Sequence, residues 1–201
     1  MTEAWAAIEI DPERVLAYSP RFGRLYLLPA HDLRDAGFRR VAGLSEAART
    51  VGLVDPVRRV VRDRASRGDA AAPAIPLGLR RAYLAMRASR SVLPLRPCAK
   101  LVRRAAITVG ARWITRGASS AEIGATVQAI EDAAGAGDCY ARALITAFLC
   151  LSARRACVLA VGVLAPTRKM HAWCCVEGDL PYEPSPEHYL YQPVWMLSLA
   201  P

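Results

Sequence analysis

The sequence predicts an α+β protein in two parts, with a small strand-rich module preceding a larger domain of helices and strands. Three observations support this prediction. Short apolar runs separated by turn residues occupy the first thirty positions, whereas helical spacing of apolar residues dominates residues 77–134. Over residues 139–177 the pattern then changes from one apolar helix to two buried strands.

Length and composition favour a folded protein. The 201 residues are enough for one large or two small domains, and 53% hydrophobic residues provide a packed core. No apolar run reaches the roughly 18 residues that a membrane span needs, and the N-terminus lacks the basic start of a signal peptide. We therefore expect a cytoplasmic protein whose six cysteines are free thiols. Since no C-x-x-C pair is present, we expect no metal site.

The net charge of +9 lies mostly in the first half and comes almost entirely from arginine. Such a charge can attract an anionic partner. Solvated helix faces in an alanine- and arginine-rich composition explain it more simply, because no nucleic-acid-binding motif accompanies the charge. We therefore expect neither a nucleic acid nor a membrane as partner.

The front part is predicted as a winged-helix-like module over residues 1–70. Its strands are expected near 5–10, at 14–18 and at 24–28, with a turn at 19–23. Its helices are expected over 30–37, 45–51 and 55–66. A linker rich in alanine and proline is predicted over residues 71–76.

The second part is predicted to span residues 77–201. Helices are expected first, over 77–89, 98–112 and 120–134, the last with Ser119 or Ser120 as N-cap. A helix at 139–153 follows, then strands at 157–164, 170–177 and 180–183, with a tight turn at Gly178 and Asp179.

Cys139 opens the helix at 139–153 and follows Asp138, a good capping residue. A thiol attacks a carbonyl as the thiolate, and the positive end of a helix dipole favours that form. The unpaired N–H groups of the first helical turn can also hold a developing oxyanion. Cys139 is therefore the candidate nucleophile.

His171 is the candidate base, because a helix packed on its strand can bring Cys139 to it. Alternation places Trp173 and Cys175 on the same strand face as His171. The base needs an orienting acceptor, for which Glu183 is the first candidate and Asp179 in the turn the weaker one. The alternative is that neither residue is catalytic, because a cysteine at a helix start is often a small buried hydrophobe and a histidine on a strand is often structural.

The remaining cysteines favour a packing role. Cys98, Cys150 and Cys157 lie within apolar patterns, and Cys174 and Cys175 lie on the strand that carries His171. Metal binding by Cys139, His171 and Cys175 is conceivable, but no spacing rule supports it.

Three segments, GDCYARALITAFLCL, VLAVGV and HAWCCVEGDLPYEP, together resemble the leader peptidases of lasso-peptide biosynthesis. The resemblance covers residues 135–185 well and the helices from Leu77 weakly. It implies a transglutaminase-like (papain-like) cysteine protease domain in which Cys139, His171 and an acid cleave one peptide bond. It also implies a preference for threonine as the second-last leader residue. The family's acid is usually aspartate, whereas this sequence has Glu183, one methylene longer.

The segment RVLAYSPRFGRLYLLPAHDLR resembles the opening of the module that captures the leader in fused members of this family. The resemblance implies that the leader adds as a strand at the sheet edge, near Arg24, Tyr26 and Leu28. Trp173 is expected either to line the peptide pocket or to belong to the core. The implied partners are the precursor peptide and an asparagine-synthetase-like macrolactam synthetase. Since no Walker-type loop is present, any use of ATP is assigned to that partner.

Two rival functions remain open at this stage. An acyltransferase can use the same three residues and differs in its acceptor, an amine instead of water. A non-catalytic winged-helix protein that binds DNA or peptide requires no reactive cysteine at all.

Overall fold

The structure is a computed structural model, and it describes residues 2–5, 7–11, 13–19, 22, 24–29, 75–89, 93–135, 138–164, 167–184 and 190–201. The three helices predicted over 30–37, 45–51 and 55–66 lie outside the described residues, as does most of the predicted linker. The division of the chain at this linker therefore stays a prediction.

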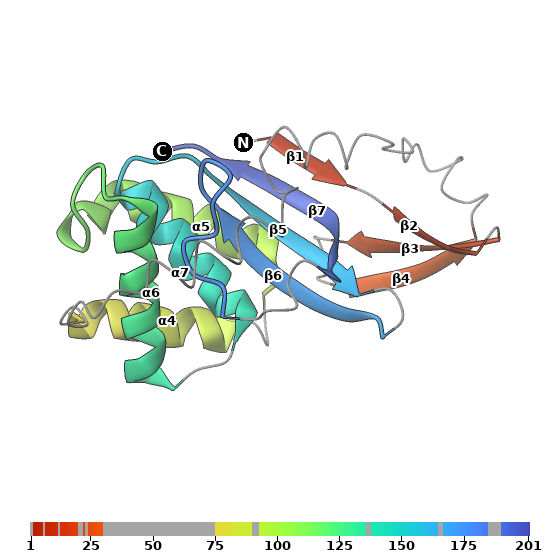
Figure 1. The fold of residues 1–201 in the computed structure, drawn as a ribbon, viewed down its shortest axis with the longest axis horizontal. Coiled ribbons are helices and arrows are strands. Elements are labelled where there is room, and N and C mark those ends of the chain that lie inside the picture. Colours follow the sequence, from red (N-terminus) through yellow and green to blue (C-terminus); the bar gives the residue numbers. More distant parts are fainter. Residues whose placement is uncertain are drawn as a thin grey trace.

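The described residues form two antiparallel sheets and a group of helices, which confirms the α+β class. The larger sheet has the strand order β1 (Thr2–Trp5), β7 (Gln192–Leu199), β5 (Cys157–Leu164) and β6 (Lys169–Cys175). The smaller sheet consists of β2 (Ala7–Asp11), β3 (Arg14–Ser19) and β4 (Arg24–Pro29). In Figure 1 the helices lie to the left of the larger sheet. The smaller sheet lies to the right, near the right-hand ends of the larger sheet's strands.

The helices are α4 (Leu77–Ser89), α5 (Leu95–Val109), α6 (Ser120–Ala134) and α7 (Cys139–Ser152). Helix α7 packs against the other three and against β5 and β6 (Figure 1). Its residues are therefore apolar almost all round, because it has neighbours on every side. This central position fixes the start of α7, where Cys139 lies.

Side-chain caps account for the starts of α6 and α7, whereas α5 begins without one. Ser119 and Glu122 form a reciprocal capping box at α6, as the sequence predicts. Helix α5 begins at Leu95, three residues before the predicted start. Pro97 lies in the first turn of this helix, where a proline costs no hydrogen bond because the N–H it lacks would have no intrahelical partner.

The two faces of β6 have different neighbours, which confirms the predicted alternation. Ala172 and Cys174 belong to the main core, together with α7. Trp173 and Cys175 belong to a second buried cluster with Val158, Ala160 and Met196. His171 starts the alternation on the side of Trp173, so β6 separates two buried layers.

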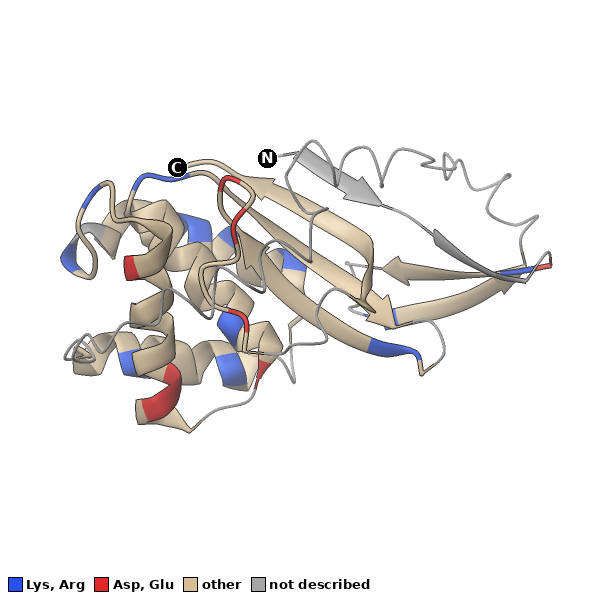
Figure 2. Ribbon diagram, viewed as in Figure 1, with Lys and Arg blue, Asp and Glu red and all other residues tan. Residues whose placement is uncertain are grey.

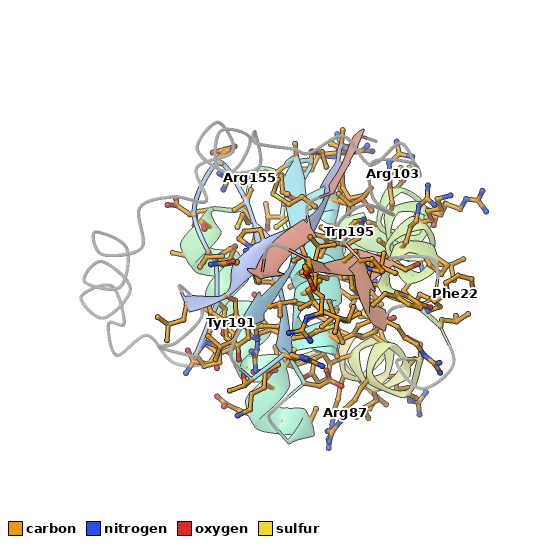
Figure 3. All side chains as sticks on the ribbon, turned by 90° about the vertical axis from the view of Figure 1, so that its right-hand side faces the viewer. Phe22, Arg87, Arg103, Arg155, Tyr191 and Trp195 are labelled. Atoms are coloured by element: carbon orange, nitrogen blue, oxygen red, sulfur yellow. The ribbon has the colours of Figure 1, made fainter. Side chains whose placement is uncertain are left out.

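Strand β7 was not predicted from the sequence. It lies between β1 and β5 and contributes Trp195, which is fully buried. Its segment VWML lacks alternation because both faces of this central strand are covered. In Figure 3, Trp195 lies in the interior of the view, whereas Arg87, Arg103 and Arg155 lie at its periphery.

The smaller sheet packs onto the same core. Leu16 and Tyr18 of β3 are buried within the main cluster, and the ring centroids of Tyr18 and Trp195 are 6.1 Å apart. Burial raises the pKa of Tyr18 to about 12, so its hydroxyl stays protonated. Strand β3 therefore connects the front part of the chain to the core of the second part.

The turn after β6 differs from the prediction by one residue. Val176 and Asp179 exchange two backbone hydrogen bonds, so Glu177 and Gly178 are the central residues. Both have positive φ, 49° and 83°, which a type I′ turn requires. The predicted third strand at 180–183 is an irregular segment, in which Glu183 is nevertheless buried.

Charged residues are concentrated on the helices and turns, and the strands of the larger sheet carry few (Figure 2). Within the described residues, no helix has both the length and the apolar character needed to cross a bilayer.

Candidate active site

Cys139 is the first residue of α7 and is partly buried. Asp138 precedes it as N-cap, and its Oδ1 accepts a hydrogen bond from the Tyr140 N–H at 2.9 Å. The acid next to the thiol is therefore engaged with the helix end, as expected from its capping role. The thiol lies at the positive end of a helix whose first N–H groups lack intrahelical partners.

Strand β6 contacts the Cys139 thiol through His171 and Ala172. Strand β6 is at an edge of the larger sheet, and the Ala172 N–H donates a hydrogen bond to Cys139. This amide therefore faces α7 instead of β5. The His171 side chain is also hydrogen-bonded to Cys139, and its Nε2 lies 2.9 Å from Glu183 Oε2. Since Nε2 is occupied by the carboxylate, Nδ1 is the nitrogen left for the thiol.

Glu183, and not Asp179, is the carboxylate beside His171. Glu183 is buried, whereas Asp179 lies exposed in the turn. A close approach of backbones helps to place Glu183. Gly124 of α6 packs so tightly against Pro181 that a Cβ at this position would lie 1.9 Å from the Pro181 carbonyl oxygen. Glycine is thus required at the point where α6 supports the segment that carries Glu183.

The pKa values of the thiol and imidazole shift toward an ion pair. Burial raises the pKa of Cys139, but hydrogen bonds from His171 and from the Ala172 N–H, with the imidazolium charge, lower it overall. Burial lowers the pKa of His171, but its contacts with Cys139 and Glu183 outweigh this and raise it to about 9. The arrangement therefore favours a thiolate next to an imidazolium.

We expect a bell-shaped dependence of turnover on pH, with its basic limb near pH 9, because cleavage needs both the thiolate and a protonated imidazole. The ion pair forms as pH rises through the lowered pKa of Cys139, and it is lost as His171 deprotonates at about 9. Protonation of His171 also stabilises the folded protein, because the pKa of this group is higher in the folded than in the unfolded state. This stabilisation is fully present below the ordinary pKa of 6.5 and is lost as pH rises through about 9.

Initial rates of peptide cleavage between about pH 5 and 10, followed by mass, measure this profile. Iodoacetamide labelling of Cys139 reports its acidic limb alone, because labelling needs only the thiolate. Glu183→Gln should move the basic limb to lower pH, because it removes the carboxylate that raises the pKa of His171. A basic limb that stays in place in this variant would contradict the assignment.

Aromatic rings cover His171 on the side of the second cluster. The Trp173 ring stacks at a centroid distance of 5.8 Å, and the Tyr191 ring lies at 5.0 Å. Trp173 is only 6% exposed, so its ring is part of the core and limits the movement of the imidazole. Its predicted contact with a peptide stays a prediction.

The other predicted peptide-binding residues are remote in sequence and lie on β4. Arg24, Tyr26 and Leu28 alternate along this strand and share one of its faces. Arg24 and Tyr26 are exposed and Leu28 is half-buried. Strand β4 ends the strand order of the smaller sheet within the described part of the chain, so the predicted edge position is present.

Sequence reasoning missed three residues that lie behind Glu183: Arg142, Glu131 and Tyr83. Arg142 contacts both Glu183 and Glu131, and the Tyr83 hydroxyl donates to Glu131 at 2.9 Å. A signal was present, since Arg142 is the one charged residue of α7 and Glu131 lies on the buried side of α6. Charged residues at core positions are rarely fully buried unless they are paired.

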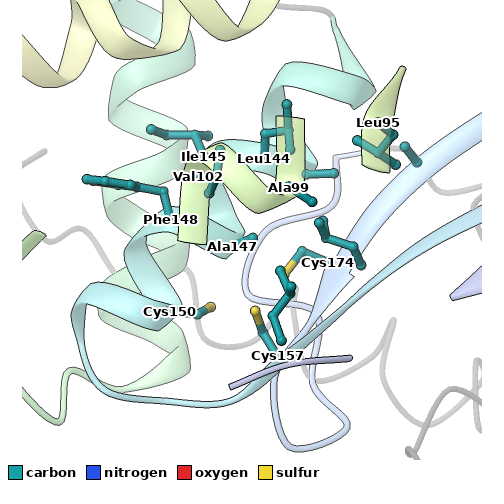
Figure 4. Close-up of a cluster of buried hydrophobic side chains, with 14 of the residues drawn as sticks. Leu95, Ala99, Val102, Leu144, Ile145, Ala147, Phe148, Cys150, Cys157 and Cys174 are labelled. Atoms are coloured by element: carbon teal, nitrogen blue, oxygen red, sulfur yellow. The ribbon is translucent and has the colours of Figure 1, made fainter. Parts of the chain in front are cut away.

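A second group of cysteines lies away from Cys139. The sulfur atoms of Cys150, Cys157 and Cys174 come from α7, β5 and β6, and all lie within 4.8 Å of one another (Figure 4). Three sulfur ligands at this spacing can hold a soft metal ion. Apolar side chains such as Leu144 and Ala147 surround them, as the predicted packing role requires.

Comparison with known proteins adds no relative. No family model, no curated protein and no solved structure matches this chain.

Proposed function

We propose that this protein is a cysteine peptidase in which Cys139 is the nucleophile, His171 the acid–base and Glu183 the orienting carboxylate. One observation carries the proposal: a thiol at a helix start is hydrogen-bonded to an imidazole whose other nitrogen is 2.9 Å from a buried carboxylate. A nucleophile, a base and an orienter in this order are the requirement for covalent acyl transfer.

The residues act in two stages. The Cys139 thiolate attacks the carbonyl carbon of the scissile peptide, and N–H groups at the start of α7 hold the oxyanion. The His171 imidazolium gives its proton to the leaving amine, and a thioester remains on Cys139. Neutral His171 then takes a proton from water, which attacks the thioester and releases the acid. Glu183 keeps the imidazole in one orientation throughout.

For the substrate we propose the leader of a lasso-peptide precursor. The resemblance of residues 135–185 to leader peptidases supports this choice, and with it a transglutaminase-like fold for residues 77–201. The leader would add along the exposed strand β4, where main-chain hydrogen bonds supply affinity. Cleavage would free the amine on which an asparagine-synthetase-like partner closes the macrolactam, with ATP used by that partner.

The test incubates the purified full-length protein with a candidate precursor peptide and follows the masses of both products. We expect one cut, after a leader whose second-last residue is threonine, and loss of cutting after treatment with iodoacetamide. An intact precursor, with the synthetase and ATP also present, would reject the substrate. Cutting that survives complete alkylation of Cys139 would reject the mechanism.

The same experiment separates peptidase from acyltransferase. After hydrolysis, the masses of the two products add up to the mass of the precursor plus one water. After transfer to an added amine, the leader product is an amide, and its mass exceeds that of the free acid by the mass of the amine minus one water. A non-catalytic binding protein would retain the precursor without any change in mass.

A further inference from the structure

Arg142 lies one helical turn after Cys139 and is buried under the catalytic cluster. On an α-helix, residues three apart share a face, so the Arg142 side chain extends from the same side of α7 as the nucleophile. It is 7% exposed. A guanidinium cannot be buried at low cost unless its charge and its donors are matched.

Two carboxylates, those of Glu131 and Glu183, form ion pairs with the Arg142 guanidinium. Its Nε lies 3.1 Å from both oxygens of Glu131, and its Nη1 lies 3.5 Å from Glu183 Oε1. Glu131 is 1% exposed and also accepts a hydrogen bond from Tyr83. Burial lowers the pKa of Arg142, but these carboxylates raise it above its usual value, so the charge is retained. Helices α4 and α6 thus anchor the guanidinium from behind.

The two oxygens of Glu183 have different partners. Oε1 faces Arg142, whereas Oε2 faces His171. A glutamate side chain has more rotatable bonds than an aspartate, and burial alone does not select one rotamer. Two partners with positive charge, one on each oxygen, do select one.

We propose that Arg142 is a positioning residue of the active site: held by Glu131 and Tyr83, its guanidinium fixes the Glu183 carboxylate and, through it, the ring of His171. The proposal rests on the catalytic roles assigned above to Cys139, His171 and Glu183. It requires no contact between Arg142 and the peptide, since the guanidinium lies behind Glu183.

A double-mutant cycle between Arg142→Met and Glu183→Gln tests the inference, with two readouts. The first is the rate of Cys139 alkylation by iodoacetamide against pH, and the second is precursor cleavage. We expect Arg142→Met alone to slow alkylation and to lower kcat about 10- to 100-fold, with KM little changed. In the Glu183→Gln background, the same substitution should have almost no further effect.

Conservative variants keep the test valid if Arg142→Met does not fold. Arg142→Lys retains a cation but not the planar fork, so it should restore part of the loss. Glu131→Gln should reproduce part of the loss with Arg142 intact. The matched control is Arg155→Met, which removes a salt-bridged arginine just beyond the other end of α7 and should leave both readouts unchanged.

The two proposals fail in different ways. Rapid alkylation of the wild-type thiol without any cleavage of precursor would reject the substrate and leave the positioning role of Arg142 supported by the cycle. Equal effects of Arg142→Met in both backgrounds would overturn the positioning role, even with cleavage fully present. Unchanged alkylation in Arg142→Met, Arg142→Lys and Glu131→Gln would also overturn it.

Discussion

Replacing Cys139 with alanine is expected to lower the rate of precursor cleavage by about four orders of magnitude or more. The covalent route needs the sulfur, and Cys139 supplies the thiol at the start of α7. His171→Ala should lower the rate to a similar extent, because thiol and imidazole act as one unit. The double variant should therefore be hardly worse than either single variant.

Cys98→Ser is the matched control for these variants. Cys98 is a buried cysteine in α5 that accepts a hydrogen bond from the Tyr140 hydroxyl at 3.0 Å, and serine retains this bond. Its cleavage rate should stay within a few-fold of the wild type. Circular dichroism of each variant shows whether the fold is kept. Cleavage by folded Cys139→Ala at the wild-type rate would exclude Cys139 as nucleophile.

Trp195→Ala is expected to destabilise the protein by about 3–5 kcal/mol. Trp195 is fully buried in β7, and its ring lies against Tyr18 of the smaller sheet. The substitution removes apolar contacts and leaves a cavity between the two sheets, which the surrounding structure fills only in part. A loss of this size is a large share of the roughly 5–15 kcal/mol that stabilises a typical domain.

Urea unfolding followed by tryptophan fluorescence and by circular dichroism measures this loss as a lower midpoint. Leu101→Ala is the control, because Leu101 lies on α5 with 55% of its surface exposed, and its effect should stay near 0.5 kcal/mol. A midpoint for Trp195→Ala equal to that of Leu101→Ala would show that the two sheets do not share one core.

Local signals were sufficient for much of the second part of the chain. The helix over Leu77–Ser89 and the strand over Cys157–Leu164 have the predicted bounds, because apolar spacing and flanking turn residues determine both. Cys139 was placed correctly at a helix start, since Asp138 is a recognisable cap. Glu183 was the first candidate for the carboxylate beside His171, with Asp179 as the alternative, and the structure places Glu183 2.9 Å from His171, although the strand expected to carry it is an irregular segment.

Other features depend on neighbours that are distant in the sequence. Strand β7 has no alternation, and it was overlooked because its pattern depends on burial on both faces. The turn at Glu177 and Gly178 was shifted by one residue, because φ at Glu177 follows from the pairing of Val176 with Asp179. The buried charge of Arg142 is intelligible once α4, α6 and the segment around Glu183 are seen together.

The sequence by itself determined the class of the fold, the helix that begins at Cys139, and the candidate triad, because these depend on periodicity, capping and residue chemistry within short segments. Only the tertiary structure decided that the Ala172 amide faces the thiol, that Glu131 and Tyr83 hold Arg142, and that Arg142 holds Glu183. These contacts join residues up to 48 positions apart, and their free energy depends on desolvation and charge matching in the interior, which no local pattern records.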